Sequence, residues 1–146
     1  MMKFSRGLLT CLVITAVSLS SANAKINNGN DFFKNQQVEV FNQPLGDGVK
    51  STTWYAKPLR IQLPENNALK PEVMWLQVYS TGYTGAFNQY VEINCKEPVK
   101  SHIMTADGDK ISFKASMAYP DDPWDDNFIN HIDRDAVGGI FSYYCS

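Results

Sequence analysis

The fold is decided near the C-terminus by the stretch IDRDAVGGIFSYYC, residues Ile132–Cys145. Its apolar residues recur at the spacing of one face of an α-helix: Ala136, Val137, Ile140, Phe141 and Tyr144. Asp133 or Asp135 is suited to cap the start of this helix, because an acid there accepts hydrogen bonds from unpaired backbone N–H groups. Gly138 and Gly139 weaken the helix by about 2 kcal/mol relative to alanines. We therefore predict an amphipathic terminal helix whose backbone approaches a sheet closely at the two glycines.

Upstream of this helix, the sequence alternates between apolar and polar residues in the way that half-buried strands do. The alternating segments are 59–63, 91–95 and 111–115, with a further short strand candidate at Val38–Phe41. Val73–Tyr79 is almost wholly apolar, which predicts a central strand covered on both faces. Asp107-Gly108 predicts a hairpin with a type I′ turn. The fold class that we predict is α+β: an antiparallel sheet of about five to six strands with a C-terminal α-helix packed on one face.

The first 24 residues read as a signal peptide. Lys3 and Arg6 precede an apolar run that is too short to cross a bilayer, which needs about 20 residues, and Ala22-x-Ala24 closes the segment. We expect cleavage after Ala24. Residues 25–50 then form an N-terminal arm with a short strand, and residues 51–146 form a single α+β domain.

Two cysteines, Cys95 and Cys145, remain once Cys11 leaves with the signal peptide. An exported chain with two cysteines permits one pairing, so we predict a Cys95–Cys145 disulfide. Removing Lys3 and Arg6 leaves 11 basic against 15 acidic residues, a net charge of −4. Nucleic-acid binding is therefore not expected, because it requires an excess of phosphate-neutralising Lys and Arg.

The residues suited to contact a partner lie in predicted loops. Exposed aromatic side chains are common anchors of protein interfaces, and an acidic loop suits a basic partner surface. The candidates are Tyr83, Phe87 and Trp124, together with the carboxylates Asp121, Asp122, Asp125 and Asp126. Calcium binding by this acidic loop stays open, although its spacing does not match an EF-hand. We expect no metal, no cofactor and no catalytic residues, because His102 and His131 lie in no zinc motif and no G-x-S-x-G occurs.

Several motifs between Trp54 and Cys145 resemble the surface-adhesin E family of secreted proteins of Gram-negative bacteria. They are the strand from Trp54, the apolar segment 73–78, the segment Glu92-Ile93-Asn94-Cys95-Lys96, the hairpin at Asp107-Gly108, and the final segment 132–141 leading to Cys145. Here Asp133-Arg134-Asp135 replaces the family's Pro-x-Ser type start of the last helix, and Pro120–Asn127 is an insertion particular to this chain. The resemblance implies a small non-enzymatic protein of the periplasm or outer surface that adheres to host matrix proteins.

Three functional hypotheses follow. The first is an exported, adhesin-like module that binds another protein, either a host matrix component or an envelope protein. The second is a periplasmic inhibitor or immunity protein that neutralises a toxin or a cell-wall hydrolase, for which the acidic loop around Trp124 is suited. A small hydrolase is a third, weaker alternative. A free strand edge also permits a homodimer.

Overall fold

The computed structural model describes residues 36–46, 50–64 and 70–146. The predicted signal peptide and the first part of the predicted N-terminal arm lie outside these residues. Within them the chain forms six strands, two α-helices and two short 3₁₀ turns. The strands are β1 (Val38–Leu45), β2 (Lys50–Gln62), β3 (Val73–Gly82), β4 (Asn88–Asn94), β5 (His102–Met104) and β6 (Lys110–Ser112). The helices are α2 (Phe113–Ser116) and α3 (Arg134–Tyr144), and the turns are η1 (Pro98–Lys100) and η2 (Phe128–Asn130).

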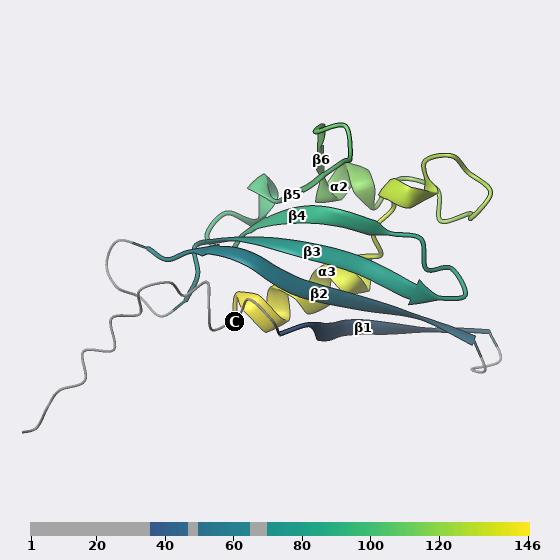
Figure 1. Cartoon of the computed structure of the whole chain (residues 1–146), viewed down its shortest axis with the longest axis horizontal. Helices are drawn as coiled ribbons and strands as arrows, with labels where there is room; N and C mark the ends of the chain where they lie inside the picture. The colour runs from purple at the N-terminus through teal and green to yellow at the C-terminus, as the bar shows by residue number, and fades with distance from the viewer. Residues whose placement is uncertain (1–35, 47–49, 65–69) are drawn as a thin grey trace, which may run out of the picture.

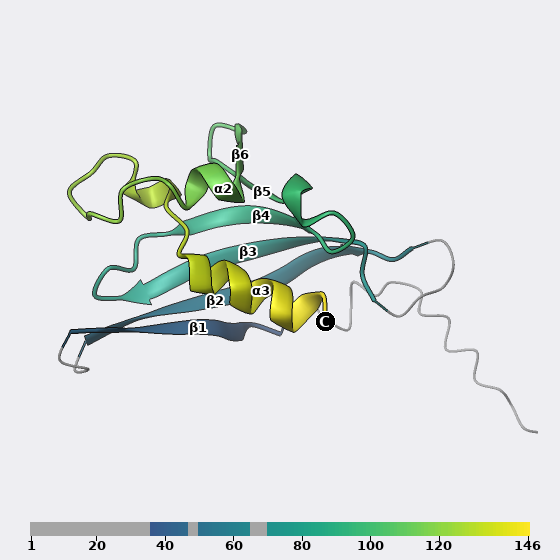
Figure 2. The same ribbon diagram turned by 180° about the vertical axis from the view of Figure 1, so that it is seen from behind.

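The six strands form one antiparallel sheet in the order of the chain, from β1 to β6. Helix α3 lies across one face of this sheet, in front of it in Figure 2 and behind it in Figure 1. The predicted α+β architecture is therefore confirmed. Strand β1, which the sequence places in the arm, is an edge strand of the same sheet and extends to Leu45.

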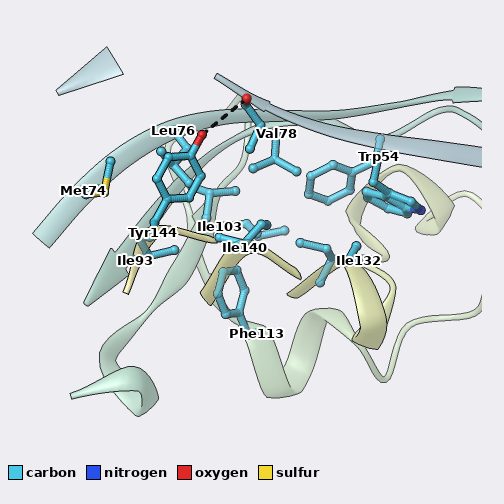
Figure 3. Close-up of a cluster of buried hydrophobic side chains, with 14 residues drawn as sticks. Trp54, Met74, Leu76, Val78, Ile93, Ile103, Phe113, Ile132, Ile140 and Tyr144 are labelled. Carbon is cyan, nitrogen blue, oxygen red and sulfur yellow. Dashed lines mark hydrogen bonds between the residues drawn. The ribbon is translucent and has the colours of Figure 1, made fainter. Parts of the chain in front are cut away.

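The core lies between the sheet and α3. Alternate residues of β2 and β3 point to this side, as the period of two requires. Figure 3 shows these side chains meeting Ile140 and Tyr144 of α3. The buried apolar side chains are Trp54, Ala56, Met74, Leu76, Val78, Phe87, Val91, Ile93, Ile103, Phe113, Ile132, Ala136, Ile140 and Tyr144.

The second half of β2 departs from the sequence prediction. The pairing with β3 shifts register between Pro58 and Arg60. Because of this bulge, Leu59 is 37% exposed, and Leu63, beyond the end of the strand, is 39% exposed. Only Ile61 of the three predicted inward residues packs against the core.

The prediction that β3 is covered on both faces is wrong. Only Met74, Leu76, Val78 and Ser80 are buried, and the alternate residues on the other face stay half-buried. In the described residues no helix covers that face (Figure 1). Side chains on this face instead pack against one another. Tyr79 stacks on Tyr55 with ring centroids 5.3 Å apart, and the Arg60 guanidinium lies 4.7 Å from the Trp75 ring.

The segment after the Asp107-Gly108 hairpin is only partly a strand. Strand β6 ends at Ser112, where the predicted strand would run on to Ala115. The Ser112 hydroxyl accepts a hydrogen bond from the Ala115 N–H at 3.2 Å and so caps the short helix α2. The hairpin itself is confirmed, but its loop has three residues between the hydrogen-bonded pair Thr105 and Asp109, and not the two of a type I′ hairpin.

The terminal helix and its covalent link are as predicted. Asp133 is the N-cap of α3, and its Oδ1 accepts hydrogen bonds from the N–H groups of Asp135 and Ala136 at 2.7 and 3.2 Å. A disulfide joins Cys95, just after β4, to Cys145, with the two Cα atoms 5.2 Å apart. The disulfide therefore ties the end of α3 to the sheet. None of the described helices is long and apolar enough to cross a membrane.

Candidate binding site at the loop end of the sheet

Three segments that are far apart in the sequence meet at one end of the sheet. They are the end of β1 (Gln43–Gly46), the β3–β4 loop (Tyr83–Phe87) and the segment before α3 (Tyr119–Asp133), and together we call them the loop end. All three lie on the right in Figure 1 and on the left in Figure 2. A cavity of about 100 Å³ lies between them, and residues of each segment line it.

The β3–β4 loop is held in place by hydrogen bonds to the start of β2. The Thr52 hydroxyl accepts a hydrogen bond from the Thr84 N–H at 3.2 Å and shares a second one, of 2.5 Å, with the Thr84 hydroxyl. Gly82 adopts a φ of +109°, and a Cβ there would overlap the Ser51 carbonyl oxygen. A residue with a side chain is therefore disfavoured at the point where β3 turns into this loop.

The two aromatic residues of this loop have opposite environments. Tyr83 is 66% exposed, and the Lys50 ammonium group lies 4.2 Å from its ring centroid. Phe87 is only 2% exposed, and its ring centroid lies 5.3 Å from that of Trp54. The prediction of Phe87 as an exposed anchor is wrong. Its backbone bonds to Ser80 through both the N–H and the carbonyl oxygen, so the ring points into the core.

The acidic loop is exposed and internally ordered. Trp124 is 93% exposed. The Asp122 carboxylate accepts a hydrogen bond from the Trp124 N–H at 3.0 Å, and the Asp125 carboxylate accepts one from the Asn127 N–H at 2.8 Å. The carboxylates of these two acids thus stabilise turns of the backbone. Asp121 and Asp126 are exposed and make no hydrogen bond of this kind among the described residues.

The segment that leads into α3 is fixed by its own polar contacts. His131 Nδ1 lies 2.7 Å from the carbonyl oxygen of Tyr119, so this nitrogen carries the proton that is donated. The Ser116 hydroxyl donates a hydrogen bond to the Asn130 carbonyl. Ile132, between His131 and Asp133, is fully buried and anchors the segment to the core.

The cavity has a polar wall with one unsatisfied donor. Its lining residues are Gln43, Leu45, Trp54, Ser80, Thr84, Phe87, Asp121, Phe128, His131 and Asp133. Trp54 is 4% exposed, and its indole nitrogen has no hydrogen-bond partner in the described part of the chain. A buried donor without an acceptor costs about 1–3 kcal/mol of stability. Such groups are therefore rare unless a water molecule or a ligand supplies the acceptor.

The structure gathers some of the predicted site residues and separates others. Asp121 lines the cavity, and Tyr83 precedes its lining residue Thr84. Trp124 and Asp126 lie on the outer part of the acidic loop and do not line it. The sequence analysis missed the cavity residues Trp54, Gln43, Thr84, His131 and Asp133. No spacing in the sequence indicates them, because they come from four separate segments that only the fold brings together.

Among residues 36–46, 50–64 and 70–146, no three His, Cys, Asp or Glu side chains lie close enough to hold an ion. This includes the acidic loop, for which calcium binding was left open.

In the described core, burial and, to a lesser degree, the nearby Tyr143 raise the pKa of the Tyr144 hydroxyl above its ordinary value.

The loop end combines two features that are suited to binding. Its distinguishing features are an ordered, exposed tryptophan on an acidic loop and a small polar cavity beside it. The disulfide is typical of an oxidising compartment outside the cytoplasm. In comparisons with protein-family models, with curated proteins and with solved structures, nothing matches this chain at a significant level.

Proposed function

We propose that this protein is an exported, non-enzymatic module that binds another protein through its loop end. The observation that carries the proposal is the position of Trp124, which is 93% exposed on a loop whose backbone is braced by two aspartates. A large apolar ring held in water on an ordered loop gains free energy when a partner covers it. The conformational entropy that the loop loses on binding is small, because hydrogen bonds already order it.

The charge around Trp124 indicates the chemistry of the partner. Asp121, Asp122 and Asp126 are exposed on the same loop, and the mature chain carries a net charge of −4. A partner with a basic surface is attracted to this loop over a range of about 8 Å at physiological ionic strength. Added salt therefore slows association more than it speeds dissociation.

The sequence and the disulfide support the proposed compartment, and the family resemblance supports the proposed class of partner. The signal peptide expected at residues 1–24 and the Cys95–Cys145 disulfide support export to the periplasm or the outer surface of a Gram-negative cell. The resemblance to the surface-adhesin E family supports adhesion to a host matrix protein. We accordingly name a basic matrix or envelope protein as the partner.

Affinity capture tests this proposal. The immobilised mature chain is exposed to purified matrix proteins and to envelope extract, and the dissociation constant of each captured protein is measured. Trp124→Ala is expected to weaken binding at least about 30-fold, the effect of an interface hot spot. Val99→Ala is the matched control, because Val99 is 89% exposed but lies on η1, away from the loop end. Equal affinities of the Trp124→Ala variant and the unaltered chain contradict the proposal.

One observation favours an inhibitor as a second candidate. The acidic loop stands out from the sheet near the start of β4 (Figure 1), and a projecting loop is suited to enter the cleft of an enzyme. Under this alternative the mature chain inhibits a basic cell-wall hydrolase or toxin, and Trp124→Ala relieves the inhibition. A panel of muramidases and amidases separates the candidates, since an adhesin leaves all their rates unchanged.

A further inference from the structure

We propose that the cavity at the loop end binds a protonated α-amino group together with the carbonyl oxygen on the adjacent carbon. This chemistry occurs at the amino end of a peptide chain and in free amino acids. The inference deepens the proposed function and rests on it, because the protein partner would present the amino end. The cavity residues take no part in the contact proposed for Trp124. In this inference they hold the amino end.

The cavity is lined by a tryptophan whose indole donor is unsatisfied. The Trp54 indole N–H is buried and has no acceptor in the described residues. Figure 3 shows the nitrogen at the end of the ring that points away from Val78 and Ile140, so the core does not supply the missing acceptor. Trp54 also lines the cavity. A carbonyl oxygen that enters from the cavity side supplies what the indole lacks.

The lining residues of the cavity also include an excess of acceptors. Asp121 and Asp133 both line it. Asp133 uses its Oδ1 for the cap of α3, which leaves Oδ2 for a ligand. Because the His131 Nδ1 proton is donated to Tyr119, the Nε2 atom of a neutral ring is also an acceptor. These groups favour a cationic donor such as an ammonium group and disfavour an anion.

The size of the cavity limits which ligands fit. A cavity of about 100 Å³ has room for about three water molecules. An ammonium group with its neighbouring carbon and carbonyl fills a comparable volume, whereas a whole amino-acid side chain of large size does not fit. The ligand therefore enters by its end, and the rest of a peptide continues outward past the acidic loop.

Titration followed by ¹⁵N–¹H correlation spectra tests the inference on the mature chain. The three indole N–H signals come from Trp54, Trp75 and Trp124. Glycinamide and triglycine are expected to shift the Trp54 signal saturably. The Trp75 signal is an internal control, because its N–H donates to Glu92 at 2.9 Å on the other face of the sheet. The Trp124 signal reports on the exposed loop.

Three further probes distinguish the chemistry and its source. Ethylammonium lacks the carbonyl and N-acetylglycinamide lacks the ammonium group, so neither is expected to shift the Trp54 signal at the same concentration. Free glycine carries a carboxylate in place of the amide. A stronger response to triglycine than to glycine assigns the site to a peptide end, and the reverse order assigns it to a free amino acid and overturns the peptide source.

A pair of charge-matched variants completes the test. Asp121→Asn is expected to weaken triglycine binding about fivefold or more, the loss of one charge-assisted hydrogen bond. Asp126→Asn removes the same charge from the same loop but not from the cavity wall, and it is expected to leave the affinity unchanged. Equal effects of the two variants overturn the inference in favour of general electrostatic attraction.

The outcomes separate this inference from the proposed function. If no probe shifts the Trp54 signal, the cavity holds water only and the inference is overturned, while partner capture that depends on Trp124 still supports the module. If the probes bind but Trp124→Ala leaves partner capture unchanged, the cavity is a ligand site and the proposed protein-binding function fails.

Discussion

Gly139 of α3 packs directly against the backbone carbonyl of Val40 in β1. A Cβ at position 139 would overlap this carbonyl oxygen, whereas a Cβ at the neighbouring Gly138 would meet nothing within 4 Å. The two adjacent glycines therefore have different reasons to be there. Gly139 sets the distance between the helix and the edge strand, while Gly138 leaves open space at the helix surface.

This contrast predicts opposite effects of one substitution at the two positions. Gly139→Ala is expected to destabilise the fold by about 1–3 kcal/mol, because a backbone contact must move apart. Gly138→Ala is expected to stabilise it by up to about 1 kcal/mol, since alanine is the better helix former. Urea unfolding of both variants measures these changes, and equal effects would contradict the assignment of Gly139 as the contact.

Loss of the Cys95–Cys145 disulfide is expected to lower stability by about 4 kcal/mol. The two cysteines are 50 residues apart, and the cross-link removes the entropy of that loop from the unfolded chain. The measurement compares urea unfolding of the mature chain with that of the Cys95→Ser, Cys145→Ser double variant. Thiol titration of the unreduced mature chain serves as the control and should find no free sulfhydryl.

Alkaline pH is expected to destabilise the fold through Tyr144. Burial raises the pKa of its hydroxyl, so the folded state retains a proton that the unfolded state loses above pH about 10. Stability is therefore unaffected by this group below pH about 10 and falls as pH rises above it, by up to about 1.4 kcal/mol per pH unit. Urea unfolding across this range measures the decline.

Tyr144→Phe is the variant that isolates this effect. The hydroxyl donates only a long hydrogen bond of 3.5 Å to the Ala56 carbonyl, so the variant is expected to lose about 1 kcal/mol or less at neutral pH. Above pH about 10 its stability should decline less steeply than that of the unaltered chain. Tyr143→Phe, at a position that is 53% exposed, should retain most of the decline.

The cap of α3 predicts a graded series at Asp133. Asp133→Ala is expected to cost about 1 kcal/mol, because the N–H groups of Asp135 and Ala136 lose their acceptor. Asp133→Ser keeps an acceptor of suitable length and should cost much less. Thermal unfolding of the two variants checks the order. A cost for Ser equal to that for Ala would show that the charge of Asp133, and not its capping bond, stabilises the helix.

Local patterns in the sequence predicted the elements whose stability is local. The apolar stripe from Ala136 to Tyr144 gave the terminal helix, because the 3.6-residue period of a helix leaves a direct trace in the chain. The count of two cysteines outside the expected signal peptide predicted the disulfide. The same patterns failed at Leu59, where a β-bulge shifts the period by one residue, and at Phe113, where the Ser112 hydroxyl starts a helix.

The sequence by itself thus determined the type and order of most elements and the covalent link, since these depend on neighbours along the chain. Only the tertiary structure decided that Phe87 is buried, which of two glycines touches a backbone, and that Gln43, Trp54, Thr84 and Asp133 surround one cavity. The physical reason is that burial, close approach and an unsatisfied donor are properties of the space between segments. No period of two or of 3.6 residues records which distant segments share that space.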